Sequence, residues 1–280
     1  MSPDFMIIGA MKCGTSTLQA QLAAQPQVFM TTPKEPNFFS DDDVFQNGLD
    51  WYAALFADAT SGQLTGEAST HYTKLPTHPH TIARMRAAQL RPKLIYMVRN
   101  PVERAVSHFI HAWSMGEVDQ DPTTALAVLP EIVEYGRYAM QIQPYCDTFG
   151  VENIHLTSLE QVKADPDGEL GKIAIFLGLE GQVAWQHEME SQNVSADRMR
   201  PFPLQGLIID NPVARGLRRV LVPKALRDRI RKSRTMQERP KLTTEDVGRL
   251  EHVYRADRAH LATMFPGHPA LDLCYPFAVK

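Results

Sequence analysis

The sequence predicts an α/β protein with a three-layer, P-loop-like fold, in which helices flank a central, mostly parallel sheet. Three short segments, 5–8, 94–98 and 153–156, have the apolar character of buried strands. Segments with helical signals follow them, and a glycine-containing loop joins the first strand to its helix. Strands that alternate with helices favour a parallel sheet, and strand, glycine loop and helix form the typical opening unit of a nucleotide-binding fold.

The first helix is predicted to begin at Thr15. Leu18, Leu22 and Ala23 recur at helical spacing and should form one buried face. Pro26 cannot continue a helix, so we expect the helix to end before it.

The second unit begins with the strand at 94–98. Pro101 suits the first position of a helix, and Asn100 before it suits the N-cap. We therefore expect a helix over 101–113.

The third strand, 153–156, precedes a helix at 170–177 that should end at Gly178. A last helix is predicted over 244–265. It begins with the capping-box sequence that starts at Thr243.

Composition and charge set the broad class of the protein. The chain has 280 residues, is 44% hydrophobic and carries a net charge of −3. These values predict a folded protein with no nucleic-acid partner, because disordered chains are less apolar and nucleic-acid binders more basic. The longest apolar runs, 5–11 and 173–179, are too short to span a bilayer. We expect one domain over 1–280, and the sequence leaves its oligomeric state open.

The N-terminus has no basic segment followed by an apolar core, which predicts a cytoplasmic protein. The three cysteines, Cys13, Cys146 and Cys274, are too few and too scattered for a disulfide framework. None of them forms a CxxC pair, so the cysteines predict no metal site.

Positive charge is concentrated in residues 215–241. This segment carries eleven basic and two acidic residues, a net charge of +9, which leaves −12 for the rest of the chain. Leucine and isoleucine recur there at helical spacing, and Pro223 divides the segment into two short amphipathic helices. We expect a basic helical segment at 212–241 near the ligand site, and favour this over a peripheral membrane contact through 215–241.

The loop at 9–17 has the properties of an anion site. Backbone N–H groups and the N-terminus of the following helix attract negative charge. Its glycines are five residues apart, as in a P-loop, but Lys12 precedes Gly14 and Thr15 takes the place of the Walker lysine. Lys12 should therefore lie near a single 5′ group of a nucleotide, beside three hydroxyls. The alternative is an ordinary strand-to-helix turn with a solvated lysine.

Two further segments carry polar residues at sites suited to chemistry. Arg99 follows a predicted central strand, and Ser107 lies two turns into the next helix, so both could bind one phosphate. Glu35, between Lys34 and Pro36, could be a general base at the mouth of a cleft. The alternatives are a helix-capping arginine, a helix-face serine and a solvated loop glutamate.

Together, the segments 9–17, 34–39 and 99–109 resemble the sulfotransferases that use 3′-phosphoadenosine 5′-phosphosulfate (PAPS). The resemblance is closest to the heparan sulfate and related carbohydrate sulfotransferases and their bacterial relatives, and it covers about residues 5–180. Further matches lie at 48–52, 66–69, 136–138, 165–166 and 176–179.

The resemblance implies roles for these residues. Arg99 and Ser107 would bind the 3′-phosphate, and Glu35 would deprotonate the acceptor hydroxyl. Lys12 would also stabilise the charge that develops on the leaving nucleotide. The 5′-phosphosulfate would lie on the loop residues Lys12, Cys13, Gly14, Thr15, Ser16 and Thr17. The side chain of Cys13 is interpreted as a small group that fills a tight loop in preference to a reactive thiol.

The sequence departs from the family at two places. Ala68 stands where a lysine often follows the glutamate of the GE segment, which puts in doubt a heparan-like polyanionic acceptor and a second basic group. His71 is then a candidate acceptor-side group, although a surface or core histidine is favoured. The late nucleotide loop of the family is not intact, and Arg234 is our candidate there.

The implied reaction is the in-line transfer of a sulfuryl group from PAPS to a hydroxyl of a carbohydrate, lipid or small molecule. It would release adenosine 3′,5′-bisphosphate (PAP) and need no metal ion. The alternatives are a P-loop kinase or NTPase, which would prefer ADP·Mg²⁺ to PAP, and a non-catalytic module that binds anions or membrane surfaces.

Overall fold

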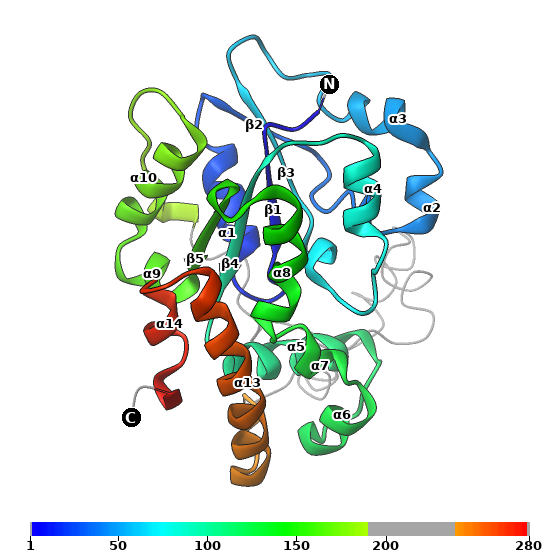
Figure 1. The fold of residues 1–280 in the computed structure, drawn as a ribbon, viewed down its shortest axis with the longest axis vertical. Helices are drawn as coiled ribbons and strands as arrows, with labels where there is room; N and C mark the ends of the chain where they lie inside the picture. Colours follow the sequence, from blue (N-terminus) through cyan, green and yellow to red (C-terminus); the bar gives the residue numbers. More distant parts are fainter. Residues whose placement is uncertain (1, 190–238, 279–280) are drawn as a thin grey trace, which may run out of the picture.

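The computed structural model describes residues 2–189 and 239–278. Its centre is a five-stranded, wholly parallel sheet with the order β2-β3-β1-β4-β5 (Figure 1). The three predicted strands are confirmed as β1 (Phe5–Gly9), β4 (Lys93–Val98) and β5 (Ile154–Ser158). The sequence reasoning missed the two strands on the other side of β1, β2 (Val28–Met30) and β3 (Leu64–Ala68).

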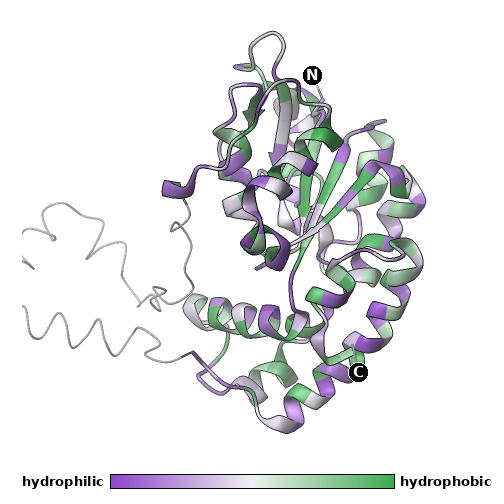
Figure 2. Cartoon of the chain, turned by 90° about the vertical axis from the view of Figure 1, so that its left-hand side faces the viewer, coloured by the Kyte–Doolittle hydropathy of each residue, from purple (hydrophilic) through white to green (hydrophobic). Residues whose placement is uncertain are grey.

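The strands are apolar because both faces of the sheet are covered. All five residues of β1 are buried, and five of the six in β4 are buried. Phe5 of β1 is in register with Lys93 of β4 and with Gly66 of β3. Figure 2 shows the hydrophobic strands inside and hydrophilic residues on the outer helices.

Helices cover the two faces as the connections require. Helix α1 (Thr15–Ala23) lies in the connection from β1 to β2, and α8 (Tyr138–Phe149) lies in the connection from β4 to β5. These connections run in opposite directions across the sheet, so right-handed crossovers place the two helices on opposite faces. Figure 1 shows α8 in front of the sheet and α1 behind it.

The predicted helices form with small changes. Helix α1 ends three residues before Pro26, and Ala23 is exposed where the prediction had it buried. Gln21 is buried there, and its side-chain amide donates to the backbone oxygen of Gln186 at 2.9 Å. Helix α5 (Pro101–Met115) is two residues longer than predicted, and Asn100 caps it by accepting from two backbone amides.

The helix predicted at 170–177 begins earlier, as α10 (Pro166–Leu177). Asp165 caps it by accepting from Gly168 N at 3.0 Å, and Gly178 ends it in the left-handed conformation. Helix α13 (Thr244–Met264) matches its prediction to one residue. Thr243 Oγ1 accepts from Asp246 N at 3.0 Å, as the capping box requires.

Short helices and turns complete the described chain.

None of the helices in the described ranges is long and apolar enough to span a bilayer. The two helices expected within 212–241 fall almost wholly outside the described residues, and 239–241 contains no helix. The remaining elements are α2 (Asp42–Phe45), α3 (Gly48–Ala54), η1 (Thr70–Thr73), α4 (Thr81–Ala87), α6 (Pro122–Val128), α7 (Glu131–Glu134), η2 (Val151–Asn153), α9 (Leu159–Ala164), η3 (His187–Met189), α14 (Ala270–Leu273) and η6 (Pro276–Ala278).

Candidate active site

A cavity of about 510 Å³ lies at the carboxyl ends of the strands. The chain that follows each of the five strands contributes to its wall, as expected for a ligand site in a parallel α/β sheet. Helix α5 and one residue after the basic segment complete it. The described lining residues are Met11, Lys12, Gly14, Thr15, Ser16, Thr17, Glu35, Thr70, His71, Lys74, Arg99, Ser107, His111, Leu159, Lys163 and Arg239.

Glycines at both ends shape the loop after β1. Gly14, with a φ of 94°, precedes α1, and a Cβ there would lie 2.9 Å from Leu159 Cδ1. Gly9 has a φ of 157°, and a Cβ there would lie 1.9 Å from Thr73 Oγ1. Side chains are therefore disfavoured at both positions, most strongly at Gly9, and the loop fits closely against its neighbours.

Lys12 lies between these glycines and has a φ of 68°, which is unusual for a residue with a side chain. Strained backbone of this kind is common at ligand sites. The hydroxyl residues Thr15, Ser16 and Thr17 form the first turn of α1, where the Thr17 N–H donates to the Gly14 oxygen at 3.0 Å and the helix N-terminus attracts negative charge. The loop therefore brings a cation, hydroxyls and a helix N-terminus to one wall of the cavity.

The side chain of Cys13 points away from this wall. It is fully buried, and its Sγ lies 3.4 Å from the hydroxyl oxygen of Tyr138. Burial raises the pKa of the Cys13 thiol to about 11, so the thiol is neutral at pH 7. Its backbone N–H donates to the Ala10 oxygen at 3.2 Å. The Cys13 side chain is therefore packed inside the loop, and its assignment as a cofactor ligand stays a prediction.

Arg99 and Ser107 both line the cavity. Arg99 follows β4, and its guanidinium donates to the Lys12 oxygen at 3.3 Å. The Nε atom of Arg99 is buried and has no hydrogen-bond partner among the described residues. Because buried donors are rarely left unpaired, this atom indicates that Arg99 binds an additional group. His111 on α5 also reaches the cavity.

Glu35 follows β2 and has a φ of 59°. Its backbone N–H donates to the Ala68 oxygen at 2.9 Å, which fixes the turn to the end of β3. Its Oε1 accepts from Lys34 Nζ at 2.5 Å and from Thr70 Oγ1 at 3.2 Å. Burial acts to raise the pKa of Glu35, but the charges of Lys34 and Lys74 outweigh it and the pKa is lowered. Glu35 is therefore an ionised carboxylate at pH 7.

Lys74 is a site residue that the sequence reasoning missed. It lines the cavity, and its Nζ lies 5.8 Å from the centre of the Tyr135 ring. Burial lowers the pKa of Lys74 to about 8. The lysine that the family often has at the position of Ala68 is missing, and Lys74 supplies a second basic group six residues later. The sequence feature that could have revealed Lys74 is its position shortly after the GE segment at 66–67. It was overlooked because strand β3, which contains that segment, was not recognised.

Two more cations were missed. Lys163 lies at the end of α9, and Arg239 lies near the end of the basic segment. The guanidinium of Arg239 donates to the Glu103 carboxylate on α5. Arg234, our sequence candidate, lies outside the described residues, so Arg239 is the residue of this segment that the structure brings to the cavity.

The charges on the cavity wall favour an anionic ligand. Its described lining contains one carboxylate, that of Glu35, against five cations: Lys12, Lys74, Arg99, Lys163 and Arg239. The enclosed geometry strengthens their combined field. Within residues 2–189 and 239–278, no cluster of three or more His, Cys, Asp or Glu side chains could hold a metal ion.

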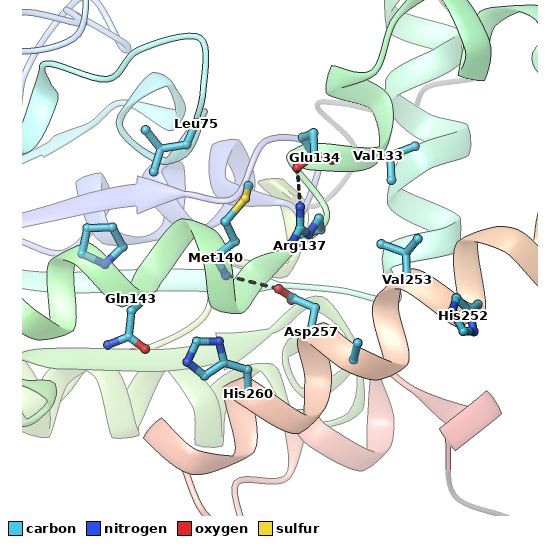
Figure 3. A pocket seen from close by; sticks show the side chains of 12 residues that line it. Leu75, Val133, Glu134, Arg137, Met140, Gln143, His252, Val253, Asp257 and His260 are labelled. Atoms are coloured by element: carbon cyan, nitrogen blue, oxygen red, sulfur yellow. Dashed lines mark hydrogen bonds and ion pairs between the residues drawn. The ribbon is translucent and has the colours of Figure 1, made fainter.

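A second, larger cavity of about 860 Å³ lies between α7, α8 and α13 (Figure 3). Leu75, Met140 and Val253 contribute apolar wall, and Arg137 pairs with Glu134 at 2.9 Å. Arg137 belongs to the matched segment 136–138, but none of the described residues predicted to bind the cofactor or acceptor lines this cavity. The cavity at the strand ends is therefore the candidate active site.

Comparisons with known proteins agree with this geometry. A family model described as "Sulfotransferase domain" matches residues 2–264. Human heparan sulfate glucosamine 3-O-sulfotransferase 6 is 31% identical over 201 residues, which cover 66% of this chain and 55% of that protein. Human heparan sulfate glucosamine 3-O-sulfotransferase 3B1 is 30% identical over 196 residues, 66% of this chain and 48% of that protein. The chain thus spans about half the length of these relatives.

Solved structures support the fold. A sulfotransferase from Alicyclobacillus acidocaldarius superposes with a TM-score of 0.67 at 22% identity, over 97% of this chain and 99% of that chain. Mouse sulfotransferase SULT7A1, solved in complex with PAP, gives a TM-score of 0.53 at 16% identity, over 99% of this chain and 90% of that chain. The predicted fold is confirmed, and the match over residues 2–264 shows that the chain belongs to the sulfotransferase domain family.

Proposed function

We propose that the protein transfers a sulfuryl group from PAPS to a hydroxyl of an acceptor and releases PAP. One observation supports this most strongly: the anion site after β1 and the carboxylate of Glu35 line the same cationic cavity. PAPS carries negative charge at its 5′-phosphosulfate and at its 3′-phosphate, and the described cavity lining has five cations and one carboxylate. A carboxylate in the same cavity can serve as the base for an incoming alcohol.

The donor would be held at both ends. Lys12 and the first turn of α1 would bind the 5′-phosphosulfate. Arg99 and Ser107 would bind the 3′-phosphate, which gives the unpartnered Nε of Arg99 an acceptor. This arrangement would also let the protein discriminate PAPS from nucleotides that lack a 3′-phosphate.

Glu35 would accept the proton of the acceptor hydroxyl. Its Oε1 is engaged by Lys34 and Thr70, which leaves Oε2 for the alcohol. As the acceptor oxygen bonds to sulfur, the bond from sulfur to the bridging oxygen of the donor breaks. Lys12 would stabilise the charge that PAP carries away. The step is balanced, because one proton moves to Glu35 and the electron pair of the broken bond leaves with PAP.

The acceptor is proposed to be an alcohol of a carbohydrate, lipid or small molecule. The names of the two human relatives refer to heparan sulfate glucosamine, which favours a carbohydrate. The cytoplasmic location and the independence from metal ions stay predictions, and a membrane contact through 215–241 stays the less favoured alternative. Cell fractionation, activity in EDTA and vesicle sedimentation test them.

The test is a calorimetric titration with PAP followed by transfer from labelled PAPS to a panel of glycans, lipids and phenols. We expect PAP to bind more tightly than adenosine 5′-monophosphate. Replacing Glu35 by glutamine should lower the transfer rate about 100-fold or more, since general base catalysis contributes about 10²–10⁴-fold. Glu152→Gln is the matched control, because Glu152 is exposed.

Absence of PAP binding by the wild-type protein would overturn the proposal. Full activity of the Glu35→Gln variant would refute only the assignment of the base.

A further inference from the structure

Two imidazole rings are stacked on the acceptor side of the candidate active site. The ring centroids of His71 and His78 lie 4.6 Å apart, and the ring planes differ by 19°. His71 lines the active-site cavity, and His78 lines a neighbouring polar cavity of about 480 Å³. The pair therefore forms a wall between these two spaces.

The backbone under His71 is firmly held. His71 lies in η1, where Thr70 Oγ1 donates to Glu35 and Thr73 Oγ1 donates to the Ile8 oxygen at 2.8 Å. His78 is held in turn, because its Nδ1 lies 3.1 Å from the Ser40 oxygen. The ring of His71 is thus fixed close to the proposed base, as a residue that orients a substrate must be.

The ring of His71 is uncharged at pH 7. Burial lowers the pKa of His71 to about 4, and the charge of Lys74 acts in the same direction. Its Nδ1 is buried and has no hydrogen-bond partner among the described residues. A proton on Nδ1 would be a buried and unpaired donor, which is costly, so we infer that Nε2 carries the proton. Because His71 lines the cavity and its Nδ1 is buried, Nε2 is the ring nitrogen left for a ligand, and it is a donor, not a base.

We propose that His71 is a specificity-determining residue that donates from Nε2 to a second oxygen of the acceptor, beside the hydroxyl that is sulfated. The preferred acceptor is then a vicinal diol, the unit found in sugar rings. This inference rests on the proposed function. A neutral donor suits a neutral hydroxyl, while Glu35 takes the proton from the neighbouring one. The two groups would thus recognise adjacent oxygens in different ways.

A pair of simple alcohols tests this inference without knowledge of the natural acceptor. Transfer from labelled PAPS is measured with trans-1,2-cyclohexanediol and with cyclohexanol, and kcat/KM is expressed per hydroxyl. We expect the wild-type protein to prefer the diol about tenfold, the gain expected of one good hydrogen bond. In the His71→Ala variant this ratio should fall to about one.

Two control variants distinguish the loss of a hydrogen-bond donor from a general disturbance of the structure. His71→Gln keeps a neutral donor and should retain part of the preference. His80→Ala changes an exposed histidine and should keep all of it.

The outcomes separate the two proposals. An unchanged ratio in His71→Ala, a wild-type protein with no preference, or a wild-type protein that binds PAP and sulfates neither alcohol would overturn the role of His71. Failure to bind PAP would overturn the proposed function itself.

Discussion

Replacing Gly14 by alanine should weaken nucleotide binding and destabilise the protein. The φ of Gly14 is 94°, and the added Cβ would lie 2.9 Å from Leu159 Cδ1 and 3.2 Å from Met97 Cε. A left-handed conformation costs an alanine about 1–2 kcal/mol. Both atoms are the ends of flexible side chains that can shift, so overpacking adds about 1 kcal/mol, the low end of the usual range. The free energy of unfolding should therefore fall by about 2–3 kcal/mol.

Gly48→Ala is the matched control. Gly48 also has a positive φ, of 80°, but a Cβ there would meet nothing within 4 Å. It should lose only the conformational part, about 1–2 kcal/mol. The difference between the two variants isolates the steric cost at Gly14.

Thermal unfolding and PAP titration measure both effects. For a protein of this length, 1 kcal/mol corresponds to about 2 °C in Tm. The Gly14→Ala variant should lose about 4–6 °C and Gly48→Ala about 2–4 °C. PAP affinity should fall more than about tenfold in Gly14→Ala only, because the first turn of α1 must shift. Equal losses of Tm in the two variants, or unchanged PAP affinity in Gly14→Ala, would refute this account of the loop.

Three further predictions concern the base, the nucleotide and a helix. Because Lys34 helps to lower the pKa of Glu35, the rate of transfer should stay high as pH falls until it passes below the ordinary glutamate pKa. In Lys34→Met the acidic fall in kcat/KM should move to higher pH, and an unmoved profile would contradict the role of Lys34. The pKa of Glu35 is lower in the folded protein than in the unfolded chain, so its ionised carboxylate stabilises the fold above the unfolded-state pKa. This stabilisation is lost as pH falls through the pKa of Glu35 in the folded protein. Arg99→Lys should weaken PAP binding more than binding of adenosine 5′-monophosphate, because one ammonium cannot replace a guanidinium fork on the 3′-phosphate; equal losses in a calorimetric titration would argue against this contact. Gly171→Ala in α10, where a Cβ would meet nothing within 4 Å, should raise the free energy of unfolding by about 0.5–1 kcal/mol in urea denaturation, and a loss of stability would show that the helix does not tolerate the methyl group.

The confirmed parts of the fold are those where local sequence and tertiary structure agree. Strands β1 and β4 are buried on both faces and are apolar throughout their inner residues, so their pattern could be recognised. The caps Asn100 and Thr243 act locally through their own side chains. Arg99 could be placed at the ligand edge because it comes just after a recognised central strand. Ser107 could be placed near it because it lies in the helix that follows.

Strand β3 could not be recognised because two of its residues are accommodated by contacts with residues that are distant in the sequence. Gly66 weakens a strand locally, yet the ring of Phe5 fills the space where a Cβ would be, with the nearest ring atom at 2.3 Å. Glu67 breaks the apolar pattern, yet it is fully buried, and burial raises the pKa of its carboxyl to about 7. Both features depend on residues far away in the sequence.

The missed strand explains the missed lysine. Without β3, neither His71 nor Lys74 could be assigned to the carboxyl edge of the sheet. The absence of a lysine at position 68 therefore put in doubt a second basic group at the acceptor site. The structure shows that a second cation reaches the cavity from the loop after η1. Its charge acts on Glu35 through space, so the effect on the base depends on where the ammonium lies and not on which residue carries it. Lys74 therefore helps to lower the pKa of Glu35 although it lies six residues after Ala68 in the chain.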